Sequence, residues 1–217
     1  MREAGERVRR RIELVALIVG LVAALCLVWL GARVGRGGTT PFDARVRDSI
    51  HSISSPGMTQ LLSATTSLGS QAVVIGLSAC FGILMFLKGR RDRALLVVAT
   101  MSGAEVLLSI LKKHFHRPRP EPFFDTRLPS GYSFPSGHAL LSFCCYGLLA
   151  ALGSAYVRGR IRWLIRICAA ALILAIGVSR VYLGVHYPTD VIAGYLAAMA
   201  WTAVVAAVYT YLATKET

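Results

Sequence analysis

The stretch ALLVVATMSGAEVLLSIL, residues 94–111, is apolar except for small hydroxyl residues and one glutamate. Its length approaches the roughly 20 residues that a helix needs to cross a bilayer. Five more apolar runs of this kind occur in the chain: Leu14–Leu30, Ala72–Leu87, Ala139–Val157, Trp163–Val178 and Val191–Leu212. Hydrophobic residues make up 55% of the chain, above the soluble average of about 45 to 50%. The sequence therefore predicts a protein that resides in a membrane.

The apolar runs predict an all-α polytopic membrane protein with six transmembrane helices in a bundle. Gly, Ala and Ser are frequent within the runs, and small residues allow helices to pack closely in lipid. The first run could be a signal peptide, but Gly31-Ala32-Arg33 is a poor cleavage site, so we interpret it as a span. We expect one domain, 1–217, with spans at about 12–32, 68–88, 93–112, 138–157, 162–179 and 190–213.

Basic residues between the spans predict the orientation of the chain. The compact turns Lys88–Arg93 and Arg158–Arg166 and the Arg-rich N-terminal tail lie on one side of a six-span bundle. Because basic residues accumulate on the cytoplasmic side, we expect both termini in the cytoplasm. The net charge of +13 is divided among short interhelical segments, which favours anionic lipids or a phosphate substrate over nucleic acid.

The segment between the first two spans contains a weaker signal. Thr40-Pro41 is typical of a helix start, and Val46, Ile50 and Ile53 recur on one helical face. This pattern favours a short interfacial helix. An ordinary polar loop with a few apolar residues is the alternative.

Lys112–Pro120, KKHFHRPRP, is a dense cationic segment directly after the third span. Its prolines should stop the helix and keep the following chain extended. Considered alone, the segment could consist of interface anchors that extend their charges toward water.

Ser133–His138, SFPSGH, directly precedes the fourth span. Its backbone amides should therefore point outward at a helix N-terminus, where the helix dipole attracts anions. Gly137 would let a phosphate approach the backbone closely. The alternative is a simple turn and helix cap, with His138 bonded to a neighbour.

Ser179–Asp190, SRVYLGVHYPTD, links the fifth and sixth spans. Pro188 is suited to open the last helix, and Asp190 follows His186 by four residues. Asp190 could therefore orient His186 through one ring nitrogen and leave the other free to attack. The alternative is that Asp190 only complements the helix dipole.

A count of membrane crossings tests whether these three clusters can meet. The first two lie in one loop, 112–138, and the third lies two crossings later, in the loop 179–190. All three are therefore on the same side, which the orientation makes extracytoplasmic. Two helix N-termini, several cations and two histidines would suit the binding and transfer of a phosphoryl group.

The clusters resemble the signature of the type 2 phosphatidic acid phosphatase family, K-x6-R-P, P-S-G-H and S-R-x5-H-x3-D. Lys112 and Arg119-Pro120 match the first part, 135–138 the second, and Ser179-Arg180, His186 and Asp190 the third. The match covers the third to the sixth span closely, whereas the first two spans agree only in general layout.

The resemblance implies a role for each matching residue. His186 would be the nucleophile that forms a phosphohistidine, Asp190 would orient it, and His138 would protonate the leaving lipid oxygen. The phosphate would be held by five groups: Lys112, Arg119, Ser136, the backbone amide of Gly137, and Arg180.

The resemblance also implies the substrate class and turnover without a cofactor or metal. Glu121 and Asp125 are the only acids in the third-to-fourth loop, and neither has a close acidic partner as a magnesium site would require. The expected substrate is a lipid phosphate or diphosphate: undecaprenyl diphosphate, phosphatidylglycerophosphate or phosphatidate. Membrane lipids are the expected surroundings, and no nucleic acid or obligatory protein partner is evident.

Three alternatives differ in chemistry or in class. A phosphotransferase would share the phosphohistidine step and pass the group to an acceptor other than water. A soluble vanadium-dependent haloperoxidase has the same signature but lacks six lipid-facing spans. A transporter or lipid-binding scaffold would not require His138, His186 and Asp190 together. Glu105, within the third span, would either tune Lys112 or pair with a polar group on a neighbouring helix.

Overall fold

The computed structural model describes residues 2–124 and 128–215, with side chains from 13 to 212 apart from that gap. This part of the chain forms helices and contains no β-strand. The helices are α1 (Arg2–Gly35), α2 (Thr40–Ser52), α3 (Pro56–Leu68), α4 (Gln71–Leu87), α5 (Arg91–Phe115), α6 (Gly137–Gly153), the 3-10 turn η1 (Ser154–Tyr156), α7 (Gly159–Tyr182) and α8 (Pro188–Lys215).

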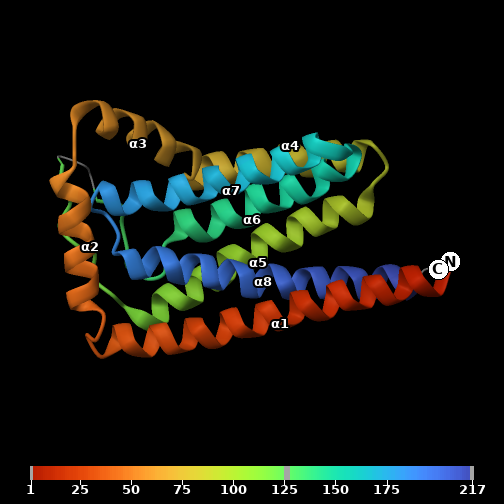
Figure 1. The fold of residues 1–217 in the computed structure, drawn as a ribbon, viewed down its shortest axis with the longest axis horizontal. Coiled ribbons are helices and arrows are strands. Elements are labelled where there is room, and N and C mark those ends of the chain that lie inside the picture. The colour runs from red at the N-terminus through yellow and green to blue at the C-terminus, as the bar shows by residue number, and fades with distance from the viewer. Residues whose placement is uncertain (1, 125–127, 216–217) are drawn as a thin grey trace.

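The long helices run side by side, and α2 lies across one end of the bundle (Figure 1). We call this end, with the segments 112–124, 128–138 and 179–190, the site end. The first and last helices pack along each other, and their outer ends lie at the opposite end (Figure 1).

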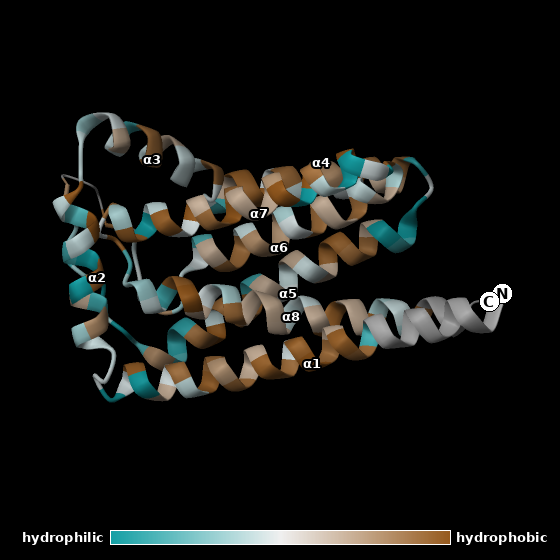
Figure 2. Ribbon diagram, in the orientation of Figure 1, coloured by the Kyte–Doolittle hydropathy of each residue, from teal (hydrophilic) through white to brown (hydrophobic). Residues whose placement is uncertain are grey.

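The outside of the bundle is apolar along most of its length (Figure 2). Within the described residues, five helices are long and apolar enough to cross a membrane, and the bent pair α3 and α4 makes a sixth span if the two helices are counted as one. Large apolar side chains such as Leu21, Trp29 and Leu164 are at least 60% exposed on the bundle surface. Exposure on this scale suits lipid as the solvent. The predicted all-α membrane fold is therefore confirmed.

Between the first two spans, the prediction was incomplete. The helix expected from Thr40 is present as α2, although its position at a membrane surface stays a prediction. A second helix, α3, was not predicted, because hydroxyl residues interrupt its apolar pattern. Pro56 opens this helix, and the hydroxyl of Ser55 caps it by accepting a hydrogen bond from the Met58 amide at 3.4 Å.

A bend of 44° separates α3 from α4, so the predicted span 68–88 combines the end of one helix with the next. At the bend, a Cβ on Gly69 would lie 2.3 Å from Cγ2 of Ile176 on α7. It would also lie 3.2 Å from Cδ2 of His138. Only glycine therefore allows the bend to approach α7 this closely, and the contact brings it beside a predicted site residue.

Close contact between α6 and α8 aligns two of the sequence clusters. A Cβ on Gly194 would lie 2.7 Å from the backbone oxygen of Ser136 and 2.9 Å from Cβ of Ala139. The Ser136 amide donates a hydrogen bond to the Asp190 carbonyl at 2.9 Å. The start of α6 is thus fixed against the first turn of α8.

Glu105 forms the type of contact that one of the two sequence interpretations expected. Nε2 of Gln71, at the start of α4, donates a hydrogen bond to Oε1 of Glu105 at 2.9 Å. The carboxylate therefore joins α5 to α4 as a partner for a polar group on a neighbouring helix.

Candidate active site

The three sequence clusters meet at the site end of the bundle. His138, in the first turn of α6, interacts electrostatically with Arg180, His186, Arg119 and Lys112. Lys112, in the last turn of α5, also interacts with Arg119, Arg180 and Asp190. The charged or titratable residues that the sequence predicted as a site therefore form one cluster, drawn from four helix ends.

His186 lies in the tight connection between α7 and α8 and is 2% exposed. The Arg180 carbonyl accepts hydrogen bonds from the backbone amides of Val185 and His186, which closes this turn. Gly184 has a φ of +74°, a conformation that favours glycine. Burial lowers the pKa of His186 to about 4, so its imidazole is neutral at pH 7.

Asp190 defines the tautomer of His186. Its Oδ2 lies 3.3 Å from Nδ1 of His186 and accepts a hydrogen bond from the Tyr187 amide at 2.9 Å. A carboxylate can only accept at this position, so Nδ1 carries the ring proton and Nε2 presents a lone pair. This is the tautomer that a histidine nucleophile needs.

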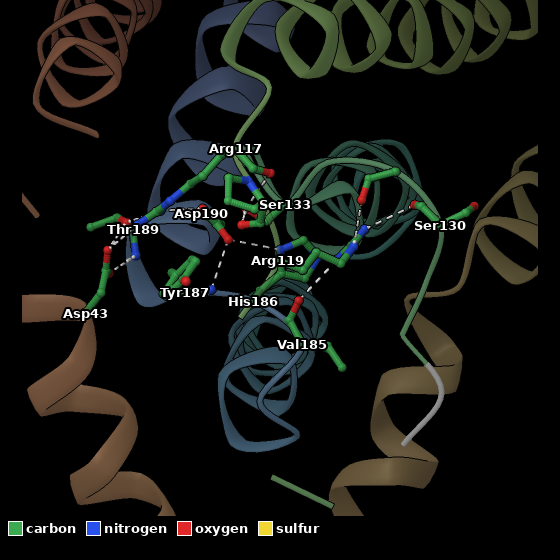
Figure 3. Close-up of polar contacts among 12 residues, drawn as sticks. Asp43, Arg117, Arg119, Ser130, Ser133, Val185, His186, Tyr187, Thr189 and Asp190 are labelled. Carbon is green, nitrogen blue, oxygen red and sulfur yellow. Dashed lines mark hydrogen bonds and ion pairs between the residues drawn. The ribbon is translucent and has the colours of Figure 1, made fainter. Parts of the chain in front are cut away.

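Arg119 contacts the ring nitrogen that the sequence analysis expected to be free. Its Nη1 lies 3.0 Å from Nε2 of His186 and 3.1 Å from the Val185 carbonyl, and its Nε donates to the Gly131 carbonyl at 3.0 Å. Figure 3 draws Arg119 and His186 next to each other. Nε2 of His186 can therefore react with another group only after this guanidinium moves away from it.

Two buried polar atoms in the cluster have no hydrogen-bond partner among the described residues. They are Oγ of Ser136, a fully buried residue, and Nε of Arg180, a residue that is 5% exposed. Nη1 of Arg180 donates to Thr66 on α3 at 2.8 Å, so only part of the guanidinium is satisfied. Unsatisfied buried groups are rare and costly, so these two atoms could still donate to an additional acceptor.

Gly137 is the first residue of α6, one position before the predicted start of the span, and the absence of a side chain here has a second cause. A Cβ at this position would lie 3.0 Å from Cδ2 of Leu108 on α5. Helix packing therefore favours glycine here, in addition to the expected approach of a phosphate to the backbone amide.

Sequence reasoning missed Arg117 and Asp43. Arg117 was part of the cationic segment but received no role, because the signature spacing selects Arg119. In the structure Arg117 contacts Asp190, with 2.6 Å between Nη1 and Oδ1, and Asp43 of α2, with 2.7 Å between Nη2 and Oδ2 (Figure 3). The repeated Arg-Pro was the one available signal for Arg117, and none marked Asp43.

Acidic residues in the loop bear on the predicted independence from metal. Asp125 lies outside the described residues. Among the residues that the structure describes, no group of three or more His, Cys, Asp or Glu could hold a metal ion. Turnover without metal stays a prediction.

Comparison with known sequences matches the site-bearing part of the chain to a family. The family model of the PAP2 superfamily matches residues 93–213. A phosphatidylglycerophosphatase B from Bacillus subtilis is 27% identical over 168 residues, which cover 76% of this chain and 82% of the relative. A lipid A 1-phosphatase from Rhizobium etli is 29% identical over 182 residues, which cover 70% of this chain and 74% of the relative.

An undecaprenyl-diphosphatase from Sulfolobus acidocaldarius is 33% identical over 119 residues, which cover 52% of this chain and 54% of the relative. Among solved structures, a transmembrane PAP2 type phosphatidylglycerolphosphate phosphatase from Bacillus subtilis matches with a TM-score of 0.79. This match has 24% sequence identity and covers 90% of this chain and 96% of the other, so it shows the shared fold.

Proposed function

Because the chain belongs to the PAP2 superfamily, we propose that it is an integral membrane phosphatase that hydrolyses lipid phosphates or diphosphates through a phosphohistidine. One observation carries the proposal. A neutral imidazole with a defined tautomer lies in a cluster of cationic groups, and two buried polar atoms of the same cluster, Oγ of Ser136 and Nε of Arg180, lack partners among the described residues. An anionic phosphoryl group with several acceptor oxygens would satisfy these atoms.

In the first step, Nε2 of His186 attacks phosphorus. A phosphorus–nitrogen bond forms, the bond from phosphorus to the lipid oxygen breaks, and that oxygen takes a proton from His138. The phosphate brings negative charge to His138, which favours its protonated form before the transfer. Asp190 accepts a hydrogen bond from the proton on Nδ1, which stays on His186, and stabilises the positive charge that develops on the ring.

In the second step, water attacks the phosphohistidine and gives a proton to His138, which is now neutral. The phosphorus–nitrogen bond breaks, inorganic phosphate leaves, and both histidines return to their starting states. The same imidazole thus serves as acid and then as base.

Cations provide most of the transition-state stabilisation in this scheme. Lys112, Arg119 and Arg180 hold the nonbridging oxygens, together with the hydroxyl of Ser136 and the amide of Gly137. Charge accumulates on these oxygens during transfer, and each fixed donor is worth roughly 100-fold or more in rate. These residues require no metal to balance the charge.

The substrate class follows from what the proposed site contacts. Every assigned group binds or reacts at the phosphoryl group, and the site lies at the end of an apolar bundle. We therefore propose a lipid substrate with a terminal phosphate or diphosphate, such as undecaprenyl diphosphate, phosphatidylglycerophosphate or phosphatidate. The names of the relatives, which include a phosphatidylglycerophosphatase and an undecaprenyl-diphosphatase, support this class.

We further propose that the protein lies in a bacterial cytoplasmic membrane with both termini in the cytoplasm and the site on the extracytoplasmic face. Reporter fusions test this orientation. An alkaline phosphatase fusion after Pro129 should be active, and one after Arg158 should be inactive. The reverse pattern would place the site in the cytoplasm.

The decisive experiment measures phosphate release from the three lipids by purified protein in detergent with EDTA present. Wild type should release phosphate and form an acid-labile phosphoprotein, and His186→Ala should do neither. Release that persists in His186→Ala would contradict the phosphohistidine mechanism. A phosphotransferase would instead form the phosphoprotein without releasing inorganic phosphate. It would lose the phosphoryl group only when a second lipid or sugar is added, and that acceptor would become phosphorylated.

A further inference from the structure

Two buried carboxylates share one guanidinium beside the proposed nucleophile. Arg117 donates from Nη1 to Asp190 on α8 and from Nη2 to Asp43 on α2, at 2.6 and 2.7 Å. The side chains of the two aspartates are at most 1% exposed, and that of Arg117 is 12% exposed. Figure 3 shows Arg117 on the side of Asp190 that faces away from Arg119.

Asp43 also binds the first turn of α8. Its Oδ1 accepts a hydrogen bond from the Thr189 amide at 3.1 Å, and its Oδ2 accepts one from the Thr189 hydroxyl at 2.8 Å. The first amides of a helix have no partner within the helix, so a carboxylate here acts as a cap. In this structure the cap comes from a different helix, far away in the sequence.

Each carboxylate binds a different nitrogen of the Arg117 guanidinium, and this arrangement affects the contact between Asp190 and His186. Oδ1 of Asp190 is bound to Arg117, which turns Oδ2 toward Nδ1 of His186 and the Tyr187 amide. Without the charge of Asp43, Arg117 would pair with Asp190 alone. Asp190 would then give less electrostatic support to the positive ring that forms during phosphoryl transfer.

Burial makes this arrangement costly to disturb and sensitive to geometry. A buried charge without a partner is strongly unfavourable, so Arg117 requires the two aspartates in their observed positions. The ring of Tyr187 lies over the guanidinium, 4.0 Å from its central carbon, and restricts its movement further. A displacement of α2 would therefore be transmitted to the carboxylate that orients the nucleophile.

We propose that Asp43 and Arg117 are positioning residues that act through Asp190 to hold His186 in its attacking orientation. The proposal rests on the phosphohistidine mechanism. It assigns α2 to the catalytic apparatus, in addition to its place across the end of the bundle.

The first test compares Asp43→Asn with Asp48→Asn. Both remove one negative charge from α2, but Asp48 is exposed. Small displacements of reacting groups cost up to about 100-fold, so Asp43→Asn should lower kcat by about 10- to 100-fold and change KM by less than about twofold. Asp48→Asn should match wild type. A wild-type kcat for folded Asp43→Asn would overturn the proposal.

A double-mutant cycle tests whether Asp43 acts through Asp190. Groups that act as one unit show strongly non-additive effects. In an Asp190→Asn background, Asp43→Asn should therefore lower the residual kcat by less than about twofold. An equal loss in both backgrounds would show a general structural effect and would contradict the proposal.

Thr189→Val provides a second route if Asp43→Asn fails to fold. This variant removes the hydroxyl that bonds to Asp43 and to Arg117 but retains all charges. The two lost hydrogen bonds both involve charged partners, but the carboxylate and the guanidinium themselves remain, so kcat should fall by about 3- to 10-fold. Asp190→Asn should abolish the difference. An unchanged kcat would overturn the proposal.

The outcome for His186→Ala separates the two proposals. If His186→Ala still releases phosphate, the phosphohistidine mechanism fails, and the positioning role fails with it. If His186→Ala is inactive while Asp43→Asn and Thr189→Val both turn over like wild type, only the positioning role fails.

Discussion

The site end and the opposite end of the bundle both carry many basic residues, yet the structure treats them differently. At the site end, Arg117 and Arg180 are largely buried and contact groups on distant helices. At the opposite end, Arg91 and Arg160 are exposed. There, Nε of Arg162 donates to the carbonyls of Ser154 and Val157 at 3.2 Å, close to it in the sequence.

The difference shows what converts a basic cluster into a candidate site. Arginines near a membrane surface extend into water by default and need no specific partner. At the site end, Asp43 on α2 and Asp190 on α8 neutralise the charge of Arg117, whereas Arg180 is buried with only part of its guanidinium hydrogen-bonded. Charge alone therefore does not identify the functional end, whereas buried and partly satisfied charge does.

The largest expected effect comes from changing one arginine at each end of α7. Arg180→Lys should lower kcat/KM by about 100- to 1000-fold, because lysine cannot reproduce the planar set of donors around the phosphate. Arg166→Lys, near the opposite end of the same helix, should stay within about twofold of wild type. Phosphate release by purified protein measures both. An equal loss of kcat/KM in both variants would contradict the functional difference between the two ends of the bundle.

The second prediction separates the clusters without changing any charge. Gly194→Ala would place a Cβ 2.7 Å from the Ser136 carbonyl, so the start of α6 must move away from α8. We expect kcat to fall by about 10-fold or more, since the donors at this helix start shift relative to His186. Gly76→Ala on α4 is the control, because an added Cβ would contact nothing within 4 Å apart from the neighbouring backbone of its own helix. Wild-type turnover by Gly194→Ala would contradict this prediction, because it would show that α6 and α8 can separate here without loss of activity.

The third prediction concerns stability in acid. His186 has a pKa of about 4 in the folded protein against 6.5 as the ordinary value. Between these values the unfolded chain binds a proton that folded His186 does not, so stability must fall as the pH falls from 6.5 toward 4. Thermal unfolding of wild type and His186→Gln in detergent measures this contribution. As the pH falls from 6.5 toward 4, the Tm of His186→Gln minus the Tm of wild type should rise by several degrees. A constant difference would contradict the low pKa.

The smallest expected effect on activity is at the opposite end. Arg162→Gln removes hydrogen bonds to the carbonyls that follow α6. Each is worth about 1 kcal/mol, so Tm should fall by a few degrees while kcat and KM stay within about twofold of wild type. A large loss of kcat would indicate that this end also takes part in catalysis.

Much of the fold and of the candidate site was predictable because the signals are local. Apolar runs long enough to cross a bilayer identified the spans, and the count of crossings put His138 and His186 on one side. The structure brings the predicted site residues into one cluster. In contrast, α3 was missed because its hydroxyl residues weaken the apolar pattern, although Pro56 and Ser55 mark its start.

The sequence by itself predicted the membrane spans and the three clusters and proposed the contact of His186 with Asp190, since hydropathy and a spacing of four residues are properties of the local chain. Only the tertiary structure decided that Arg119 faces Nε2 of His186 while Arg117 faces Asp190. It alone revealed Asp43, which meets Arg117 across 74 positions of the chain. Such contacts depend on how helices pack, and helix packing brings together residues that no local pattern connects.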